Sequence, residues 1–220
     1  ECRGPLGGGS RRGAGGQAAA ADPGPVRHQP RPHPLARRTG RTRTPTRPAC
    51  APPATARAGN VIGGGDWSHE RLLPDCVRAF ANGDPVVLRL PEAVRPWQHV
   101  LDPLAGYLLL AEDLALGATS APQAVNFGPD TEATVGEVAR LAAEAWGHGA
   151  RVEERPHEDV PPETGVLRLD STLATTALGW RPRWDVRTAV DRTIAWHRAH
   201  LAGDEMASVT DAQSHEYVSE

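Results

Sequence analysis

Few residue patterns in this sequence could carry chemistry, and the strongest is Arg95 followed by Pro96 and Trp97. A guanidinium held between a proline and a flat ring is preorganised to bind a phosphate through two parallel hydrogen bonds. The alternative is a surface ion pair made by Arg95. Asn60 precedes a glycine-rich turn, where its amide could bind a ligand oxygen or could simply tolerate the turn conformation. The residue types leave both pairs of alternatives open.

The histidines give weaker signals. His197 and His200 stand three residues apart, as two metal ligands on a helix could, but no acidic or cysteine side chain within that helix completes a set. We interpret them as the basic end of a helix and expect no metal site. The segment His157–Asp159 lies between prolines and is predicted to be a loop able to touch a ligand. Cys76 is predicted to lie on a buried helix face.

The sequence contains no lysine, so the 24 basic side chains counted with lysine are all arginines. This excludes a complete Walker-type phosphate loop, a Schiff-base amine and a Tyr-x-x-x-Lys pair. The glycine strings Gly4–Ser10 and Gly13–Gly16 follow no predicted strand, so they do not predict a dinucleotide site. We therefore expect no cofactor to bind this chain. Three widely spaced cysteines argue against a disulfide framework and favour a cytoplasmic location.

Charge and composition divide the chain. Residues 1–53 hold 10 arginines, 2 acidic residues and no aromatic residue, whereas residues 54–220 hold 14 arginines against 25 acidic residues. A segment so poor in large apolar side chains is predicted to be a disordered leader, and residues 54–220 are predicted to form the folded part. No apolar run is long enough to span a bilayer, so we expect no membrane association.

Three origins of the leader can be distinguished. It could be a nucleic-acid-binding arm, because clustered arginines neutralise phosphates. It could be a transit peptide, although its single serine and lack of amphipathic period oppose this. We favour a third origin, translation out of frame, because glycine, proline, alanine and arginine are what GC-rich codons give in any frame. Nucleic acid is therefore not an expected partner. Reading the other two frames of the DNA for a Tyr-x-x-x-Lys pair tests this origin.

From residue 54 onward, predicted strands alternate with predicted helices, which indicates an α/β fold. Helix ends carry clear signals: Thr134 and Glu137 have the spacing of a capping box, and Asp185 is a predicted N-cap. Asp102 is also a predicted N-cap, with Pro103 in the first turn. The predicted strands cover 54–60, 86–90, 94–100, 124–128 and 165–169, and the predicted helices cover 71–83, 102–115, 134–146, 170–179 and 185–203. The helix over 102–115 is predicted to bury an apolar face made of Leu104, Leu108, Ala111 and Ala115.

Several segments together resemble the C-terminal half of the CDP-glucose 4,6-dehydratase family, a group of extended short-chain dehydrogenases/reductases. The resemblance runs from about residue 54 to the end. It is carried by RAGNVIGGGDW (Arg57–Trp67), RLLPDCVRAF (Arg71–Phe80), RPWQHVLDPLAGYLLLAEDL (Arg95–Leu114), VNFGP (Val125–Pro129), LGWRPRW (Leu178–Trp184) and WHRAHLAGDEM (Trp196–Met206).

The resemblance implies a substrate-binding lobe of an extended Rossmann-type dehydratase. Members of the family bind NAD in a Rossmann domain and convert CDP-glucose to CDP-4-keto-6-deoxyglucose with loss of water. By resemblance, Asn60 contacts the sugar diphosphate, Arg95 pairs with the pyrophosphate, and the remaining residues of the sugar-nucleotide pocket are Asp66, Trp67, Arg71 and His99. A CDP-sugar is thus the expected ligand.

The family's glycine-rich fingerprint and Tyr-x-x-x-Lys pair belong to its N-terminal half, which the leader does not resemble. We therefore expect a truncated dehydratase that is inactive alone, either self-associating or joined by a complementing N-terminal half. The alternative hypothesis is a non-catalytic module that binds a sugar nucleotide or a partner, with the leader as a basic arm.

Overall fold

The computed structural model describes residues 53–118, 121–155 and 165–219, all within one compact unit, Thr44–Glu220. Residues 1–52 of the predicted leader lie outside the described residues, as does the predicted loop His157–Asp159. The expectations for these two segments therefore stay predictions.

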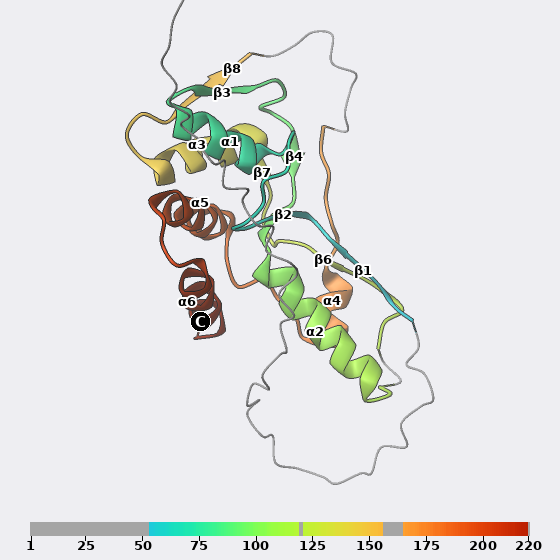
Figure 1. The fold of residues 1–220 in the computed structure, drawn as a ribbon. Helices are drawn as coiled ribbons and strands as arrows, with labels where there is room; N and C mark the ends of the chain where they lie inside the picture. Colours follow the sequence, from blue (N-terminus) through green and yellow to red (C-terminus); the bar gives the residue numbers. More distant parts are fainter. Residues whose placement is uncertain (1–52, 119–120, 156–164, 220) are drawn as a thin grey trace, which may run out of the picture. The chain divides into compact units, whose positions relative to one another are not determined.

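Strands and helices alternate along the described residues, which confirms the predicted α/β class (Figure 1). The elements are β1 (Thr55–Ala58), β2 (Asn60–Ile62), α1 (Leu72–Asn82), β3 (Pro85–Leu88), β4 (Val94–Arg95), β5 (Trp97–His99), α2 (Leu101–Ala115), β6 (Ala124–Phe127), β7 (Ala133–Thr134), α3 (Val135–Trp146), β8 (Arg151–Glu154), α4 (Thr172–Leu178), α5 (Val186–Ala202) and α6 (Met206–Ser219).

Every sheet found among the described residues has two strands. The pairs β1–β6, β2–β5 and β3–β8 are parallel, and β4–β7 is antiparallel. The strand predicted over 54–60 is split at Gly59, so that β1 and β2 pair with different partners. A Cβ atom at Gly59 would lie 2.3 Å from the Pro96 carbonyl oxygen, which explains why glycine stands at the break.

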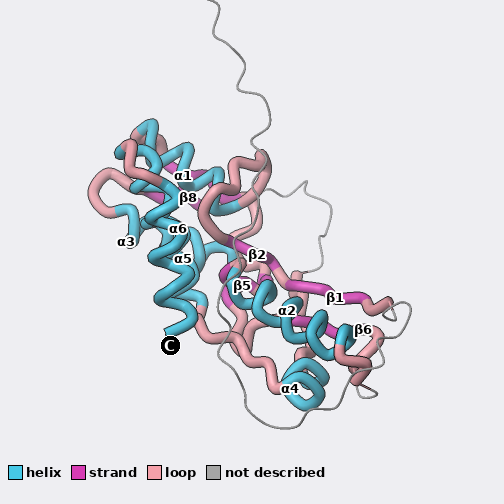
Figure 2. The backbone as a smooth tube through the Cα atoms, turned by 60° about the horizontal axis from the view of Figure 1, so that its bottom comes forward, coloured by secondary structure: helices cyan, strands magenta, loops and turns pink. Residues whose placement is uncertain are grey.

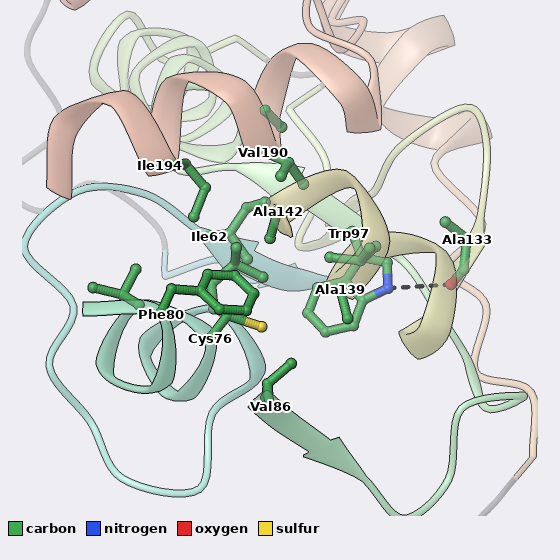
Figure 3. Close-up of a cluster of buried hydrophobic side chains, with 14 of the residues drawn as sticks. Ile62, Cys76, Phe80, Val86, Trp97, Ala133, Ala139, Ala142, Val190 and Ile194 are labelled. Atoms are coloured by element: carbon green, nitrogen blue, oxygen red, sulfur yellow. Dashed lines mark hydrogen bonds between the residues drawn. The ribbon is translucent and has the colours of Figure 1, made fainter. Parts of the chain in front are cut away.

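One group of elements, the larger region, contains α1, α3, α5, β2, β3, β5 and β8 around one core (Figures 1 and 2). Figure 3 shows Cys76 and Phe80 of α1 facing Ile194 of α5 and Ala142 of α3 across this core. The Trp97 indole nitrogen donates to the Ala133 carbonyl over 3.1 Å, which satisfies its buried polar atom. The predicted burial of Cys76 is confirmed, and burial raises the pKa of its thiol to about 12.

A second group, the smaller region, contains α2, α4, β1 and β6 around a separate cluster (Figures 1 and 2). Phe127 is its centre, with ring centroids 5.0 Å from Trp180 and 5.5 Å from Tyr107. The Phe127 ring also lies directly on Gly106 of α2, where a Cβ atom would come within 2.4 Å. The close approach of helix and strand therefore requires glycine at this position.

The locally encoded helix ends agree with the sequence. Thr134 accepts from the Glu137 backbone nitrogen over 3.0 Å, and the Thr134 nitrogen donates to Glu137 over 2.7 Å, which confirms the capping box. Asp185 accepts from the Thr188 nitrogen over 2.8 Å as the N-cap of α5. Gly83 and Gly203 end their helices with φ of 76° and 85°.

The start and the buried face of α2 differ from the prediction. The N-cap residue is Val100, and Asp102 is fully buried inside the first turn. Tyr217 and the Arg183 backbone both donate to Asp102, which turns this side of the helix inward. Leu104 and Leu108 of the predicted buried face are therefore 46% and 73% exposed, and Ala111 and Ala115 are exposed with them.

One further prediction was wrong, and one helix was not predicted. The segment 165–169 contributes an isolated bridge between Val166 and Val94 instead of a strand. The chain beyond Gly203, for which no element was predicted, forms α6. Tyr217 is the one buried side chain of α6, so the sequence offers no apolar period that would reveal the helix.

Candidate functional site

A pocket of about 650 Å³ opens among β2, the loop that follows it, the start of α1, and the segment from β3 to β4. Its volume is in the range of small-molecule sites. Four of the six predicted binding residues line it: Asn60, Asp66, Arg71 and Arg95. The structure thus brings together side chains that are up to 35 positions apart in the sequence.

Strand pairing places Asn60 near Arg95. The β2–β5 register sets Asn60 opposite Trp97, two residues beyond Arg95, and the Asn60 nitrogen donates to the Pro96 carbonyl over 2.8 Å. The Arg95 guanidinium donates to its own neighbour's carbonyl, Val94 O, over 2.9 Å. Both residues are half-buried, so a ligand in the pocket would meet an amide and a guanidinium with restricted freedom.

The N-terminus of α1 faces the same pocket. Arg71 is its N-cap residue, in extended conformation, and Leu72 and Leu73 of the first turn also line the pocket. Backbone N–H groups at a helix start, with the positive end of the helix dipole, favour an anion. Arg71 adds a guanidinium at this end of the pocket.

Two carboxylates balance part of this positive charge. Asp66 accepts from the Ser68 nitrogen over 2.9 Å. Burial alone would raise the pKa of Asp66, but the hydrogen bonds from Ser68 and the charge of Arg71 outweigh it and hold the pKa below its ordinary value. Glu70 also lines the pocket, with a φ of 59° that is unusual for a residue with a side chain. Ionised Asp66 can accept hydrogen bonds from ligand hydroxyl groups.

Trp67 and His99 do not line the pocket. The Trp67 ring packs on His197, with ring centroids 4.7 Å apart. His99 is 2% exposed and lies against Trp184, also at 4.7 Å between centroids. Burial, with a further contribution from Arg192, lowers the pKa of His99 to about 4, so the ring is neutral. These two residues pack against other rings of the chain instead of lining the pocket.

Sequence reasoning missed several features of the site. Arg89 and Glu70 line the pocket, but neither stands in a recognisable motif. His197, interpreted as part of a basic helix end, is instead fully buried beneath the loop that carries Asp66. No pattern within α5 signals this, because the loop that covers the ring comes from a segment 130 positions earlier in the sequence.

The glycine-rich turn after β2 is closed by a side chain of α5. A Cβ atom at Gly64 would lie 2.1 Å from the Trp196 ring, so protein already fills the space that a pyrophosphate would need. This turn therefore offers no open cradle for a dinucleotide. The described residues contain no cluster of three or more side chains suited to a metal ion, and none of their helices combines the length and apolar character that a membrane span needs.

The chain is similar to enzymes that act on nucleotide sugars, although no protein-family model matches it. Over 172 residues it is 39% identical to CDP-glucose 4,6-dehydratase of Salmonella typhimurium, which covers 76% of this chain and 46% of the relative. It is 32% identical to dTDP-glucose 4,6-dehydratase of an Actinoplanes species, over 60% of this chain and 39% of the relative. The chain thus spans less than half the length of these relatives.

Among solved structures, UDP-glucose 4-epimerase of Thermotoga maritima, determined with UDP-glucose, matches with a TM-score of 0.56 and 23% identity. This match covers 66% of this chain and 46% of the epimerase. UDP-glucose 4-epimerase of Stenotrophomonas maltophila matches with a TM-score of 0.57 and 22% identity, over 68% of this chain and 48% of the other.

The fold resembles part of the fold of nucleotide-sugar epimerases. The sequence resembles CDP-glucose 4,6-dehydratase, and the partial coverage agrees with its C-terminal half. The resemblance expected from the motifs is confirmed.

Proposed function

We propose that the pocket binds a nucleotide sugar, and that residues 54–220 are the sugar-nucleotide-binding portion of a CDP-glucose 4,6-dehydratase-like fold. The observation that carries this proposal is the convergence of Asn60, Arg71 and Arg95 on one pocket at the N-terminus of α1. Two guanidiniums and a helix start suit a diphosphate, which carries two negative charges. Similarity to CDP-glucose 4,6-dehydratase favours CDP-glucose as the ligand.

In this proposal Arg95 and Arg71 hold the two phosphates, and Asn60 donates its amide to a bridging or terminal oxygen. Asp66 accepts from sugar hydroxyls, because its carboxylate is ionised at neutral pH. Trp67 and His99 act indirectly, through the packing of the pocket walls. No bond-breaking step is assigned to these residues, since none of them forms an acid–base pair suited to hydride transfer or dehydration.

We further propose that catalysis needs a complementing half of the fold. The sequence has no lysine, so it does not itself supply a Tyr-x-x-x-Lys pair. Leu104 and Leu108 of α2 are exposed beside the parallel pair β1–β6, and parallel sheets are ordinarily covered on both faces. A second polypeptide carrying the cofactor-binding half would bury this surface. A homo-oligomer is the competing partner, which sedimentation of the isolated chain distinguishes.

The binding proposal is tested by isothermal titration of the full chain with CDP-glucose, with and without NAD. We expect CDP-glucose to bind and added NAD to change nothing. dTDP-glucose and UDP-glucose, titrated in parallel, report the choice of nucleotide. Absence of binding by all three sugar nucleotides to a folded chain would reject the proposal.

Arg95→Ala is the decisive variant, because loss of a charge-assisted contact costs roughly 1.5–3 kcal/mol, which is about 10-fold to 100-fold in affinity. Arg187→Ala is the matched control: Arg187 is exposed, pairs with Glu144 over 3.0 Å and does not line the pocket. Equal losses in the two variants would contradict the assigned role of Arg95.

The alternative function is a non-catalytic module, in which the same pocket binds the sugar nucleotide and no second half joins the chain. Co-expression with the N-terminal half of the Salmonella CDP-glucose 4,6-dehydratase separates the two functions. Water loss from CDP-glucose in the mixture supports a complementing half, whereas binding without turnover supports the module.

A further inference from the structure

The loop that carries Asp66 is fastened to the distant helix α5. Gly64 lies directly on the Trp196 ring, with space for no side chain, and Gly65 next to it has a φ of 81°. Beyond these glycines, Trp67 closes over two histidines of the same helix, with ring centroids 4.7 Å from His197 and 5.1 Å from His200. We call Trp67, Trp196, His197 and His200 the ring cluster.

His197 contacts both tryptophan rings of the ring cluster. Trp196 meets the His197 ring nearly edge-on at 5.3 Å and stacks on His200 at 5.7 Å with planes 8° apart. His197 is fully buried, and its ring contacts the Gly63 backbone of the loop as well as the two tryptophan rings. The ring therefore links α5 to the loop, mainly through its packing on Trp67 and Trp196.

The ring cluster reaches the pocket through two residues. Gly63 and Asp66 line the pocket, and both are close enough to His197 to act on its charge. Burial holds the pKa of His197 below its ordinary value; Asp66 opposes this shift, His200 adds to it, and the Gly63 backbone weakly favours the protonated ring. Asp66 and His200 are the charged or titratable groups that face the ring.

We propose that the ring cluster fixes the Gly63–Trp67 loop in the conformation that binds ligand, and that His197 is a positioning residue for the pocket. The inference rests on the proposed nucleotide-sugar site, because it assigns the cluster a part in binding there. The neutral imidazole fills the space between Trp67 and Trp196, and this packing sets where the Asp66 carboxylate stands. A charged imidazolium would be costly in the same space, so binding weakens as the ring takes up a proton.

The test compares loop order and ligand affinity in the same variants of the full chain. Amide hydrogen exchange of a peptide covering residues 62–73 is measured without ligand, and CDP-glucose affinity is measured by titration. His197→Ala is expected to speed exchange in that peptide and to weaken CDP-glucose binding about tenfold, as misplaced binding groups do. His215→Ala, at an exposed position of α6, is the control and should change neither.

A second variant covers the possibility that His197→Ala fails to fold. Trp67 is 42% exposed, so Trp67→Ala unfastens the loop while leaving the larger core intact. It is expected to give the same faster exchange and weaker binding. Unchanged exchange in this folded variant would overturn the proposal.

His197→Phe distinguishes positioning by packing from a general structural role. The phenyl ring keeps the contacts with Trp67 and Trp196 but takes up no proton. We expect exchange and affinity near the wild-type values at pH 7.5. Because burial holds the pKa of His197 below its ordinary value of 6.5, the wild-type affinity should fall more steeply than that of the Phe variant as the pH drops below about 6.5. Equal pH dependence in the two proteins would contradict the role of His197.

The outcomes also separate this inference from the proposed function. If wild-type protein binds no sugar nucleotide, the function fails, and the role of the cluster in binding falls with it while the exchange data still report loop anchoring. If wild-type protein binds and the loosened loop binds equally well, the function stands and the positioning role is rejected.

Discussion

The larger and smaller regions of this protein complete their cores to different degrees. In the larger region, three helices enclose their apolar faces among themselves, and Cys76, Val138 and Ile194 are fully buried. In the smaller region, one side of α2 packs on Phe127 while Leu104 and Leu108 on the other side face outward. The apolar surface of α2 thus exceeds what the described residues cover.

The difference shows that the two regions depend on unlike sources of stability. The larger region holds the ring cluster and most of the pocket, and its apolar side chains bury one another. The smaller region has a five-residue buried cluster and a two-stranded parallel pair, an arrangement that is weak in isolation. Leu104 and Leu108 stay exposed on its outer side.

The largest effects are expected from matched deletions in the two cores. Phe80→Ala and Phe127→Ala each remove a buried phenylalanine, and each should cost about 3–5 kcal/mol of unfolding free energy. Phe80→Ala should expose α1 and α3 to amide exchange. Phe127→Ala should expose α2 and β6 but leave α1 and α3 protected. Loss of protection throughout the chain in both variants would show that the two regions unfold as one unit.

Acid should destabilise the buried contact between His99 of β5 and Trp184. Folded His99 binds its proton less tightly than the unfolded residue, so the stability from its neutral ring is present above about pH 6.5 and is lost as the pH falls to about 4. The loss is on the order of 3 kcal/mol by chemical denaturation across this range.

His99→Gln isolates this contribution, because the variant lacks the titrating ring. Asp102 acts in the opposite direction: burial raises its pKa, so protonating it in acid relieves the folded state. Both proteins share the effect of Asp102, but only the wild type has the His99 ring. The stability advantage of the wild type over His99→Gln should therefore shrink towards low pH. A constant difference would refute the assignment to His99.

A smaller effect is expected from the hydrogen bond that joins α6 to α2. Tyr217 donates to the buried Asp102 over 2.9 Å, so Tyr217→Phe leaves a carboxylate oxygen with fewer donors and should cost about 1–3 kcal/mol by thermal unfolding. Ser219→Ala removes an exposed hydroxyl of the same helix and should change stability by less than about 0.5 kcal/mol. Similar melting of both variants would show that the contact between α6 and α2 does not stabilise the fold.

The smallest change in stability is expected at the exposed face of α2. Leu108→Gln should shift the unfolding free energy by less than about 0.5 kcal/mol, because Leu108 is 73% exposed. It should nevertheless reduce concentration-dependent association in sedimentation. Leu201→Gln, at an exposed leucine of α5, serves as the control. Equal association of the two variants would mean that α2 is no special contact surface.

Sequence reasoning succeeded where structure is decided locally. The capping box at Thr134, the N-cap at Asp185 and the glycine ends of α1 and α5 each involve residues a few positions apart. Asn60 and Arg95 were predicted to contact one ligand, and the structure brings both side chains to one pocket.

It failed where tertiary contacts choose between similar alternatives. The helix α2 has leucines on more than one face, and the contacts of Asp102 and Gly106 decided which face turned inward. His99 and Trp67 stand in the motif that resembles the family, but Trp184 and His197, from the last third of the chain, cover them. Periodicity within one segment carries no information about such covering residues.

Gly59 has a consequence for how this sequence tolerates mutation. It is the point at which the chain leaves the smaller region and enters the larger one, with β1 on one side and β2 on the other. Any side chain there would collide with the Pro96 carbonyl, whereas Gly117 has open space around it. A saturation library selected for folded protein should therefore retain glycine alone at position 59 and accept several residues at 117, Asn among them.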